Sequence, residues 1–177
     1  EAALKSIDYA TARGVDIMSN SWGGGGRSQA LFEAIERAKD AGITFVVAAG
    51  NSNSNNDKKP TYPANYKVDN VISVGALDGK GERASFSNYG EKTVHVFAPG
   101  VKIYSTVQGN RYKKMSGTSM ACPHVAGVAG LLLASEPNLT YSDIKERLMG
   151  TSVISTDLNK YTRSGYVDAH KALTNKR

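Results

Sequence analysis

The sequence predicts an α/β fold in which a mostly parallel sheet is flanked by helices. Residues 43–49, ITFVVAA, form a continuous apolar run of strand length, which is typical of a central parallel strand. Strand, helix and strand follow one another over residues 15–49, the spacing of a right-handed βαβ unit. Residues 125–134 are apolar on every face, so we expect them to form a helix that is buried in the core.

The elements before residue 43 follow from apolar spacing and from glycines. Residues 1–13 have the spacing of an amphipathic helix, which Gly14 ends. Residues 15–18 suggest a short buried strand, and a loop of four glycines follows it. Ser28 is expected to cap a helix that continues to Ala41.

The elements after residue 49 are two strands, a hairpin and two helices beyond the apolar helix. Strands are expected at residues 71–76 and 94–98, and a hairpin over residues 101–115. Thr140 and Asp143 resemble a capping box, with Asp in place of Glu, that opens the next helix. A short helix is expected to close the chain.

Composition excludes several classes of protein. The 177 residues, 40% of them apolar, indicate one globular domain over residues 1–177. The 22 basic and 16 acidic residues give a net charge of +6, but the basic residues are scattered. We therefore expect no nucleic-acid partner and a solvated basic surface, with a mild preference for acidic substrates as the alternative. No apolar run is long enough for a membrane span.

The opening residues and the single cysteine bear on where the sequence begins within the fold and on whether it can form a disulfide. The opening residues have an amphipathic helical pattern and no signal-peptide pattern, so the sequence is expected to begin inside a fold. Cys122 has no partner for an internal disulfide, and we expect a small buried hydrophobic residue rather than a reactive thiol.

Two hydroxyl residues, Thr118 and Ser119, stand where the apolar helix begins. A helix cap needs only one of them, so Thr118 can cap and Ser119 is left over. Taken alone, this pattern favours capping over a nucleophile. The free N–H groups and the positive dipole end of a helix N-terminus would nevertheless suit a developing negative charge.

Residues 117–132, GTSMACPHVAGVAGLL, change that balance. They resemble the nucleophile segment of the subtilisin-like serine proteases, and every fixed position of the Gly-Thr-Ser-Met-Ala-x-Pro-His-Val-Ala-Gly pattern is present. The resemblance implies a three-layer subtilisin-like fold and a serine endopeptidase in which Ser119 is the nucleophile, and hence a protein or peptide substrate.

A second segment, AAGN at residues 48–51, resembles the part of the family that carries the oxyanion-hole asparagine. By itself, an Asn at this point is often only a turn former. The resemblance implies that the Asn51 amide and the Ser119 N–H hold the oxyanion. It also implies that Ala48, Ala49 and Gly50 line one wall of the pocket for the substrate side chain before the cut bond.

Two more segments are implied to bind the substrate. Ser21-Trp22-Gly23-Gly24 matches the family's Ser-x-Gly-Gly, a backbone edge on which an extended peptide pairs as an added strand. Thr61 precedes a segment like the family's Tyr-Pro-Ala, which implies a position near the pocket floor.

A serine nucleophile needs a base and a carboxylate that orients the base. None of His95, His124 and His170 lies in a segment like the family's base motif. The resemblance covers the whole chain but only the C-terminal part of the family's catalytic domain. We therefore expect a sheet that is incomplete at its N-terminal side, residues 1–177 inactive alone, and the missing N-terminal portion as a partner. Exposed strand edges are expected to drive self-association.

The alternative function is a non-catalytic peptide-binding or structural module with the same fold. No metal ligand and no cofactor are expected in residues 1–177. Some family members bind a cation with an acidic residue, but His95 stands at the corresponding position here. For the full-length protein, the resemblance leaves calcium and a propeptide open and implies a secreted or secretory-pathway location.

Overall fold

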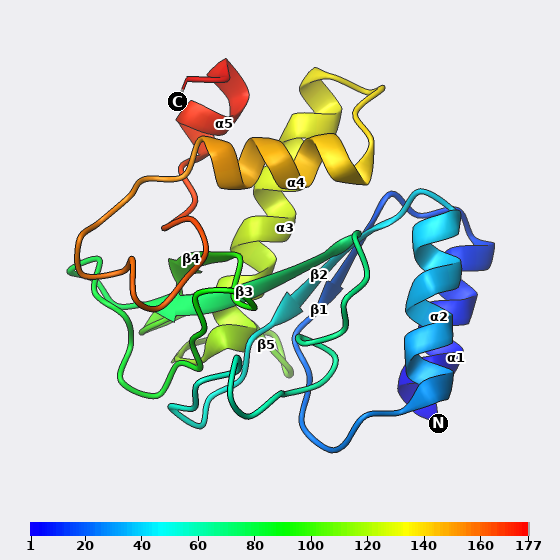
Figure 1. Ribbon diagram of the computed structural model, residues 1–177, viewed down its shortest axis with the longest axis horizontal. Helices are drawn as coiled ribbons and strands as arrows, with labels where there is room; N and C mark the ends of the chain where they lie inside the picture. Colours follow the sequence, from blue (N-terminus) through cyan, green and yellow to red (C-terminus); the bar gives the residue numbers. More distant parts are fainter. Residues whose placement is uncertain (177) are drawn as a thin grey trace.

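The computed structural model describes residues 1–176, and a parallel sheet of four strands lies at its centre (Figure 1). The strands, side by side in chain order, are β1 (Ile17–Asn20), β2 (Thr44–Ala48), β3 (Val71–Leu77) and β4 (Val96–Pro99). Every neighbouring pair is parallel, with Val46 of β2 opposite Ile72 of β3. β2 and β3 are buried at every residue, as expected of central strands. The predicted α/β class is confirmed.

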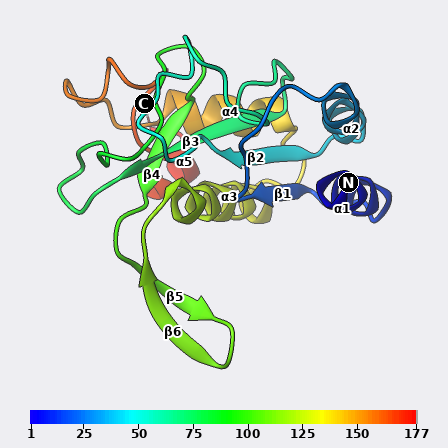
Figure 2. The same ribbon diagram turned by 90° about the horizontal axis from the view of Figure 1, so that it is seen from below.

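Helices cover both faces of the sheet and complete three layers (Figures 1 and 2). They are α1 (Ala2–Ala12), α2 (Gln29–Asp40), α3 (Thr118–Ser135), α4 (Tyr141–Gly150) and α5 (Ala169–Thr174). On one face, α1 and α2 share an apolar cluster with Phe45 of β2. On the other, α3 shares a cluster with Ile72 of β3, and this cluster also includes Ile144 of α4 and Ala172 of α5.

Local sequence explains where two of the helices begin. Ser28 precedes α2, and its Oγ accepts a hydrogen bond from the Leu31 N–H at 3.3 Å. Thr140 precedes α4, where its Oγ1 accepts from the Asp143 N–H at 3.2 Å and its own N–H donates to the Asp143 carboxylate at 2.8 Å. Both predicted caps are confirmed.

A hairpin of β5 (Ile103–Val107) and β6 (Arg111–Met115) projects from the body of the molecule beside α3 (Figure 2). Its turn passes through Gly109 and Asn110, whose φ angles of 80° and 54° are positive. Tyr104 and Tyr112 stack on the hairpin with ring centroids 5.4 Å apart. The predicted hairpin is confirmed, and it leads the chain to the N-terminus of α3.

The helix α3 is less buried than its sequence predicts. Val125 and Leu132 are fully buried, but Leu131 is 51% exposed, and His124 and Gly127 are also exposed. The expectation of burial on every face is therefore wrong, because the sheet covers one side of α3 and residues 1–176 leave part of the other side open. Length and composition alone would let α3 cross a membrane, but its packing on the sheet is that of a core helix.

The strand β1 forms an edge of the sheet. Its Met18 and Asn20 are buried while Ser19 is exposed.

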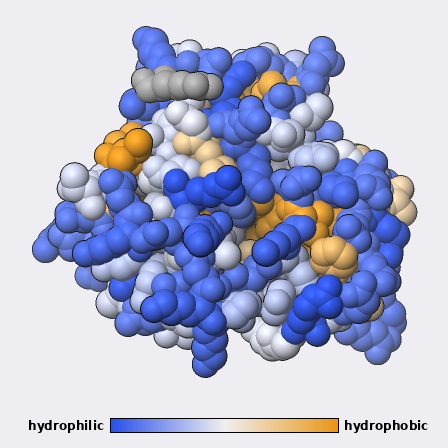
Figure 3. All heavy atoms as spheres, in the orientation of Figure 1, coloured by the Kyte–Doolittle hydropathy of each residue, from blue (hydrophilic) through white to orange (hydrophobic). Residues whose placement is uncertain are grey.

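The face seen in Figure 1 is mostly hydrophilic, with small apolar areas (Figure 3). A free strand edge can pair with another chain, so self-association remains a prediction, as does the assignment of residues 1–177 to one domain.

Candidate active site

Two strand ends and the start of one helix meet at the carboxyl edge of the sheet. Ser21 directly follows β1, Asn51 follows β2 by three residues, and Ser119 is the second residue of α3. Between them lies a pocket of about 250 Å³. Its lining consists of Ser21, Trp22, Gly23, Gly24, Ala48, Gly50, Asn51, Ser52, Thr61, Asn88, Thr118 and Ser119. The structure thus brings together every sequence-predicted site residue except Ala49.

Ala49 lies outside the pocket. Its side chain is fully buried in a cluster with Leu77 and Phe97, whereas Ala48 belongs to the cluster around α3. Successive side chains of a strand point to opposite faces, so Ala48 and Ala49 cannot line the same wall. The wall on this side of the pocket is made by Ala48 and Gly50.

Ser119 and Ser21 are held together by two reciprocal hydrogen bonds. The Ser119 Oγ donates to the Ser21 carbonyl at 3.0 Å, and the Ser21 Oγ donates to the Ser119 carbonyl at 2.7 Å. These bonds fix the end of β1 against the first turn of α3. The segment predicted to bind a peptide and the predicted nucleophile are therefore in direct contact.

Asn51 is oriented by Thr118. Its Oδ1 accepts hydrogen bonds from the Thr118 N–H at 2.8 Å and from the Thr118 Oγ1 at 2.9 Å. The Thr118 Oγ1 in turn accepts from the Gly50 N–H at 3.2 Å. Thr118 is thus not the helix cap that its position suggested, because Gly117 takes that place without a side-chain bond and Thr118 lies inside the first turn.

With Oδ1 occupied twice, the Nδ2 donor of Asn51 is the atom left for another partner. A Cβ placed on Gly117 would lie 3.4 Å from this Nδ2 and 3.7 Å from the backbone nitrogen of Ser119. Both nitrogen atoms therefore lie close to the same glycine. An anion placed there could accept from both of them, and it would also lie at the positive end of the α3 dipole.

Asn88 is a buried member of the site that sequence reasoning missed. It is 1% exposed, and its Nδ2 donates to the Thr61 Oγ1 at 3.3 Å. The hydrogen bonds of Asn88 connect residues more than 25 positions apart in the chain. No short motif marks such a network.

No histidine among the described residues bonds to Ser119. The Nδ1 of His124 is 2.8 Å from the Met120 carbonyl, one turn earlier on α3, and His170 lies exposed on α5. The Nδ1 of His95 accepts from the Ser73 N–H at 2.8 Å within the sheet. The described residues therefore place two N–H donors near the Ser119 hydroxyl but no base beside it.

His95 does not suit a cation site. The pKa of its imidazole is lowered from 6.5 to about 3, mainly by burial and also by the positive charges of Lys145 and Arg163. Its Nδ1 lone pair is already used by the Ser73 N–H. No group of three His, Cys, Asp or Glu side chains in residues 1–176 could hold a metal ion. Calcium in a longer protein remains a prediction.

Cys122 lies one turn into α3, fully buried, with its Sγ 3.8 Å from the Ser19 Oγ. Burial raises the pKa of this thiol, which keeps it protonated and poorly nucleophilic. The position agrees with the predicted small buried residue.

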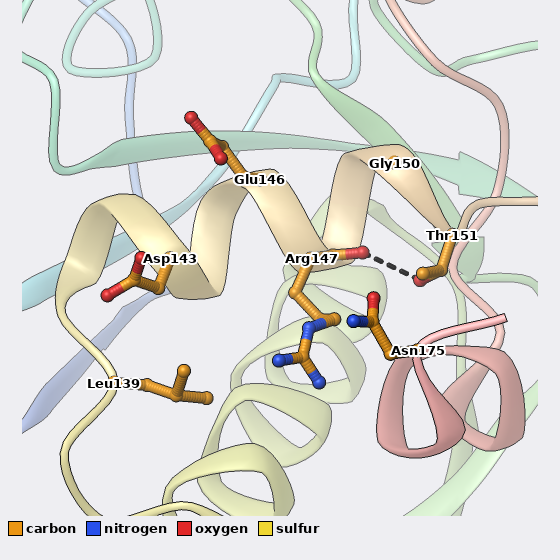
Figure 4. A pocket seen from close by; sticks show the side chains of 7 residues that line it. All are labelled: Leu139, Asp143, Glu146, Arg147, Gly150, Thr151 and Asn175. Carbon is orange, nitrogen blue, oxygen red and sulfur yellow. Dashed lines mark hydrogen bonds between the residues drawn. The ribbon is translucent and has the colours of Figure 1, made fainter. Parts of the chain in front are cut away.

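Two further hollows lie near α3. One, of about 380 Å³, runs between the β5–β6 hairpin and α3 and reaches Ser119 from the side of Met120 and His124. The other, of about 180 Å³, lies by α4 and α5 (Figure 4), where Arg147 pairs with Glu136 at 2.9 Å and Thr151 donates to the Arg147 carbonyl. Of these two hollows, only the first is lined by Ser119 and so adjoins the site.

The family follows from a match along nearly the whole chain. A model of the subtilase family matches residues 1–172. The chain belongs to the subtilase family. The subtilisin-like resemblance predicted from residues 117–132 is thereby confirmed.

Curated subtilases and solved structures show how much of a family member this chain spans. It is 45% identical over 152 residues to subtilisin DY of Bacillus licheniformis, covering 85% of this chain and 54% of that one. It is 40% identical over 171 residues to a thermostable alkaline protease of Halalkalibacterium halodurans, covering 97% of this chain and 45% of that one. The subtilase chain described here thus spans about half the length of these relatives.

Solved structures agree with the fold. A protease of Pseudoalteromonas arctica PAMC 21717 superposes with a TM-score of 0.81 at 32% identity, covering 91% of this chain and 51% of the other. The prenylagaramide maturation protease PagA gives a TM-score of 0.84 at 25% identity, covering 99% of this chain and 67% of the other.

Proposed function

We propose that this subtilase chain is the part of a serine endopeptidase that carries the nucleophile, Ser119, and the oxyanion donor, Asn51. One observation carries the proposal: the Ser119 hydroxyl lies at the first turn of α3, where the Asn51 Nδ2 and the Ser119 backbone nitrogen both lie close to Gly117. A nucleophile next to two preorganised donors is the arrangement that acyl transfer requires.

In the proposed reaction, the Ser119 Oγ attacks the carbonyl carbon of a peptide bond and gives its proton to a base. The carbonyl oxygen becomes an oxyanion, which accepts hydrogen bonds from Asn51 and from the Ser119 N–H. Collapse of this intermediate breaks the C–N bond, and the leaving amine takes the proton from the base. Water then hydrolyses the acyl-enzyme by the same steps.

The base is the missing group. The Ser119 Oγ donates to the Ser21 carbonyl rather than to an imidazole. We propose that a segment outside residues 1–177 supplies the base and its carboxylate, and that residues 1–177 alone are inactive or nearly so. The term complete enzyme is used below for residues 1–177 together with that segment.

The peptide substrate is proposed to lie along residues 21–24. Ser21 is fixed to Ser119, and the backbone from Ser21 to Gly24 lines the pocket. The Gly24 N–H already donates to the Tyr62 carbonyl at 3.0 Å, which holds the glycine loop against the segment that follows the pocket wall. An extended peptide would add to this edge as a strand.

The first prediction is that Thr61 limits the size of the side chain that the pocket accepts. Its Cγ2 methyl lies 3.5 Å from the point where a Cβ on Gly50 would stand, so it faces the pocket wall. In the complete enzyme, Thr61→Gly is expected to raise the ratio of kcat/KM for bulky over small side chains about ten-fold. Thr61→Ser keeps the hydroxyl that Asn88 bonds and removes only the methyl, so it is expected to shift the ratio in the same direction by a smaller factor. An unchanged preference in both variants would contradict this role.

The second prediction tests the function itself by labelling with a fluorophosphonate probe, which reacts with activated serine hydroxyls. Labelling is expected for the complete enzyme, is expected to be lost in Ser119→Ala, and is expected to be nearly absent for residues 1–177 alone. No labelling of a folded complete enzyme would favour a non-catalytic peptide-binding module. Labelling of residues 1–177 alone that Ser119→Ala removes would show that a histidine of this chain reaches Ser119.

The location of the protein is carried over from the family alone. We propose a secreted or secretory-pathway protease, and the detection of the protein in the culture medium or within cells decides it.

A further inference from the structure

Asn88 binds the chain on the far side of the proposed oxyanion donor. Its Oδ1 accepts from the Ser52 N–H at 2.8 Å and from the Ser54 N–H at 3.1 Å. These N–H groups belong to the first and third residues after Asn51. A carbonyl oxygen that accepts two backbone bonds fixes the exit of the loop from Asn51.

Asn88 also binds the chain on the near side. Its Nδ2 donates to the Ala49 carbonyl at 3.2 Å, and its backbone N–H donates to the Gly50 carbonyl at 2.9 Å. Four hydrogen bonds from one residue therefore enclose Asn51, two before it and two after it. The side chain of Asn51 is left free to make its own bonds to Thr118.

The approach of Asn88 to the loop depends on Gly50. The φ angle of Gly50 is +110°, a value that side-chain-bearing residues rarely adopt, and a Cβ there would lie 2.5 Å from the Asn88 Nδ2. Such a contact is too short for a carbon and a nitrogen. The close approach of Asn88 to the loop therefore requires a glycine at position 50, directly before Asn51.

Asn88 is itself held in place. Its Nδ2 also donates to the Asn56 Oδ1 at 3.0 Å and to the Thr61 Oγ1 at 3.3 Å, so its two N–H bonds are shared among three acceptors. The Arg83 guanidinium donates to the Ser87 carbonyl at 2.6 Å, and its carbon lies 4.6 Å from the centroid of the Tyr161 ring. The residue before Asn88 is thus anchored by a stacked arginine.

We propose that Asn88 is a positioning residue for the reaction, which acts by setting the Asn51 amide at the oxyanion. This inference rests on the proposed function, because it matters to catalysis only if Asn51 is an oxyanion donor. The fully buried amide of Asn88 bonds the chain on both sides of Asn51 and thereby sets the direction of the Asn51 Nδ2. A displacement of about 1 Å at such a donor can cost on the order of a hundred-fold in rate.

The test is a double-mutant cycle in the complete enzyme with Asn88→Ala, Asn51→Ala and the pair. Asn88→Ala alone is expected to lower kcat about ten- to a hundred-fold with little change in KM, because the loss concerns the transition state. In the Asn51→Ala background, the same change is expected to lower kcat less than about three-fold. An equal factor in both backgrounds would overturn the inference, since Asn88 would then act without Asn51.

Asn70→Ala is the matched control. Asn70 is equally buried and donates one bond to the Ile43 carbonyl at 2.8 Å, but it precedes β3 at the opposite end of the sheet. We expect it to lower stability while leaving kcat unchanged. An equal loss of kcat in Asn70→Ala and Asn88→Ala would show that stability alone is responsible.

Two further measurements keep the inference testable if Asn88→Ala does not fold. Asn88→Ser keeps a small polar side chain, one bond too short to replace the Oδ1 that the Ser52 and Ser54 N–H groups bind, and it is put through the same cycle. In the 177-residue chain, the Ser52 and Ser54 amides are expected to exchange hydrogen faster in Asn88→Ser than in the parent, and unchanged exchange would overturn the inference. Full turnover in Ser119→Ala would instead refute the proposed function, whatever Asn88 does.

Discussion

Replacing Asn51 with Ala is expected to lower kcat of the complete enzyme about a hundred- to a thousand-fold. That magnitude is the one known for removal of an oxyanion-hole donor from a subtilisin, so it is taken over from a relative. The physical reason is that the Asn51 Nδ2 and the Ser119 backbone nitrogen both lie close to Gly117, beside the proposed nucleophile. A donor aimed at charge that develops only in the transition state contributes to kcat and hardly to KM.

Asn51 also anchors Thr118, so the Ala variant removes two interactions together. Asn51→Asp separates them, because a carboxylate can still accept from the Thr118 N–H and Oγ1 but has no N–H to donate. We expect Asn51→Asp to fold and to be at least as slow as Asn51→Ala. Thr118→Val keeps the oxyanion donor but loses the hydrogen bond from the Thr118 Oγ1 to the Asn51 Oδ1, and we expect it to lower kcat only about ten-fold.

Steady-state kinetics on a peptide substrate, together with thermal unfolding of each variant, gives the answer. If Asn51→Ala and Asn51→Asp both stayed within about three-fold of the parent, Asn51 would not serve as an oxyanion donor. The Ser119 hydroxyl would then need another source of stabilisation.

The features that the sequence predicted well are local. The caps at Ser28 and Thr140 depend on a side chain and a backbone N–H three residues away, and both are confirmed. Strands β2 and β3 follow from continuous apolar runs, because a parallel strand that is covered on both faces has no polar side.

The features that the sequence missed depend on distant parts of the chain. Burial of α3 is set by what packs against each of its sides, and a composition that is apolar all round does not reveal that Leu131 remains exposed. The wall of the pocket was misjudged at Ala49, because strand alternation continues to that residue. Asn88 lies 36 positions from the Ser52 N–H that it binds, and its role is visible only in the folded chain.

The site lies between these two cases. Ser119 and Asn51 were reached through resemblance, and the structure adds the contacts that connect them: Thr118 to Asn51, and Ser119 to Ser21.

The second large effect concerns the stability of the fold in acid. His95 is 8% exposed, and its pKa is lowered from 6.5 to about 3, first by burial and then by Lys145 and Arg163. Between pH 6.5 and about pH 3, the His95 imidazole is therefore protonated in the unfolded chain and neutral in the folded chain. The neutral imidazole stabilises the fold fully above pH 6.5, and that contribution is lost as the pH falls toward 3.

The free energy of unfolding is expected to fall by about 1.4 kcal/mol per pH unit in this window from His95 alone, or about 2 kcal/mol by pH ~5. Denaturant unfolding at several pH values measures the slope. His95→Gln has no titrating group, and its amide oxygen can still accept from the Ser73 N–H, so its slope is expected to be flatter. Subtracting the variant from the parent removes the contribution of the carboxylates that both share.

His170→Gln is the matched control, because His170 lies exposed on α5 rather than between the sheet and two positive charges. We expect it to keep the slope of the parent. The imidazole proton resonances give a second measurement, in which the signal of His95 is expected to stay at its neutral position down to about pH 5. If His95→Gln and the parent lost stability at the same rate, the imidazole would have to be protonated in the fold, and the hydrogen bond from the Ser73 N–H to its Nδ1 could not persist.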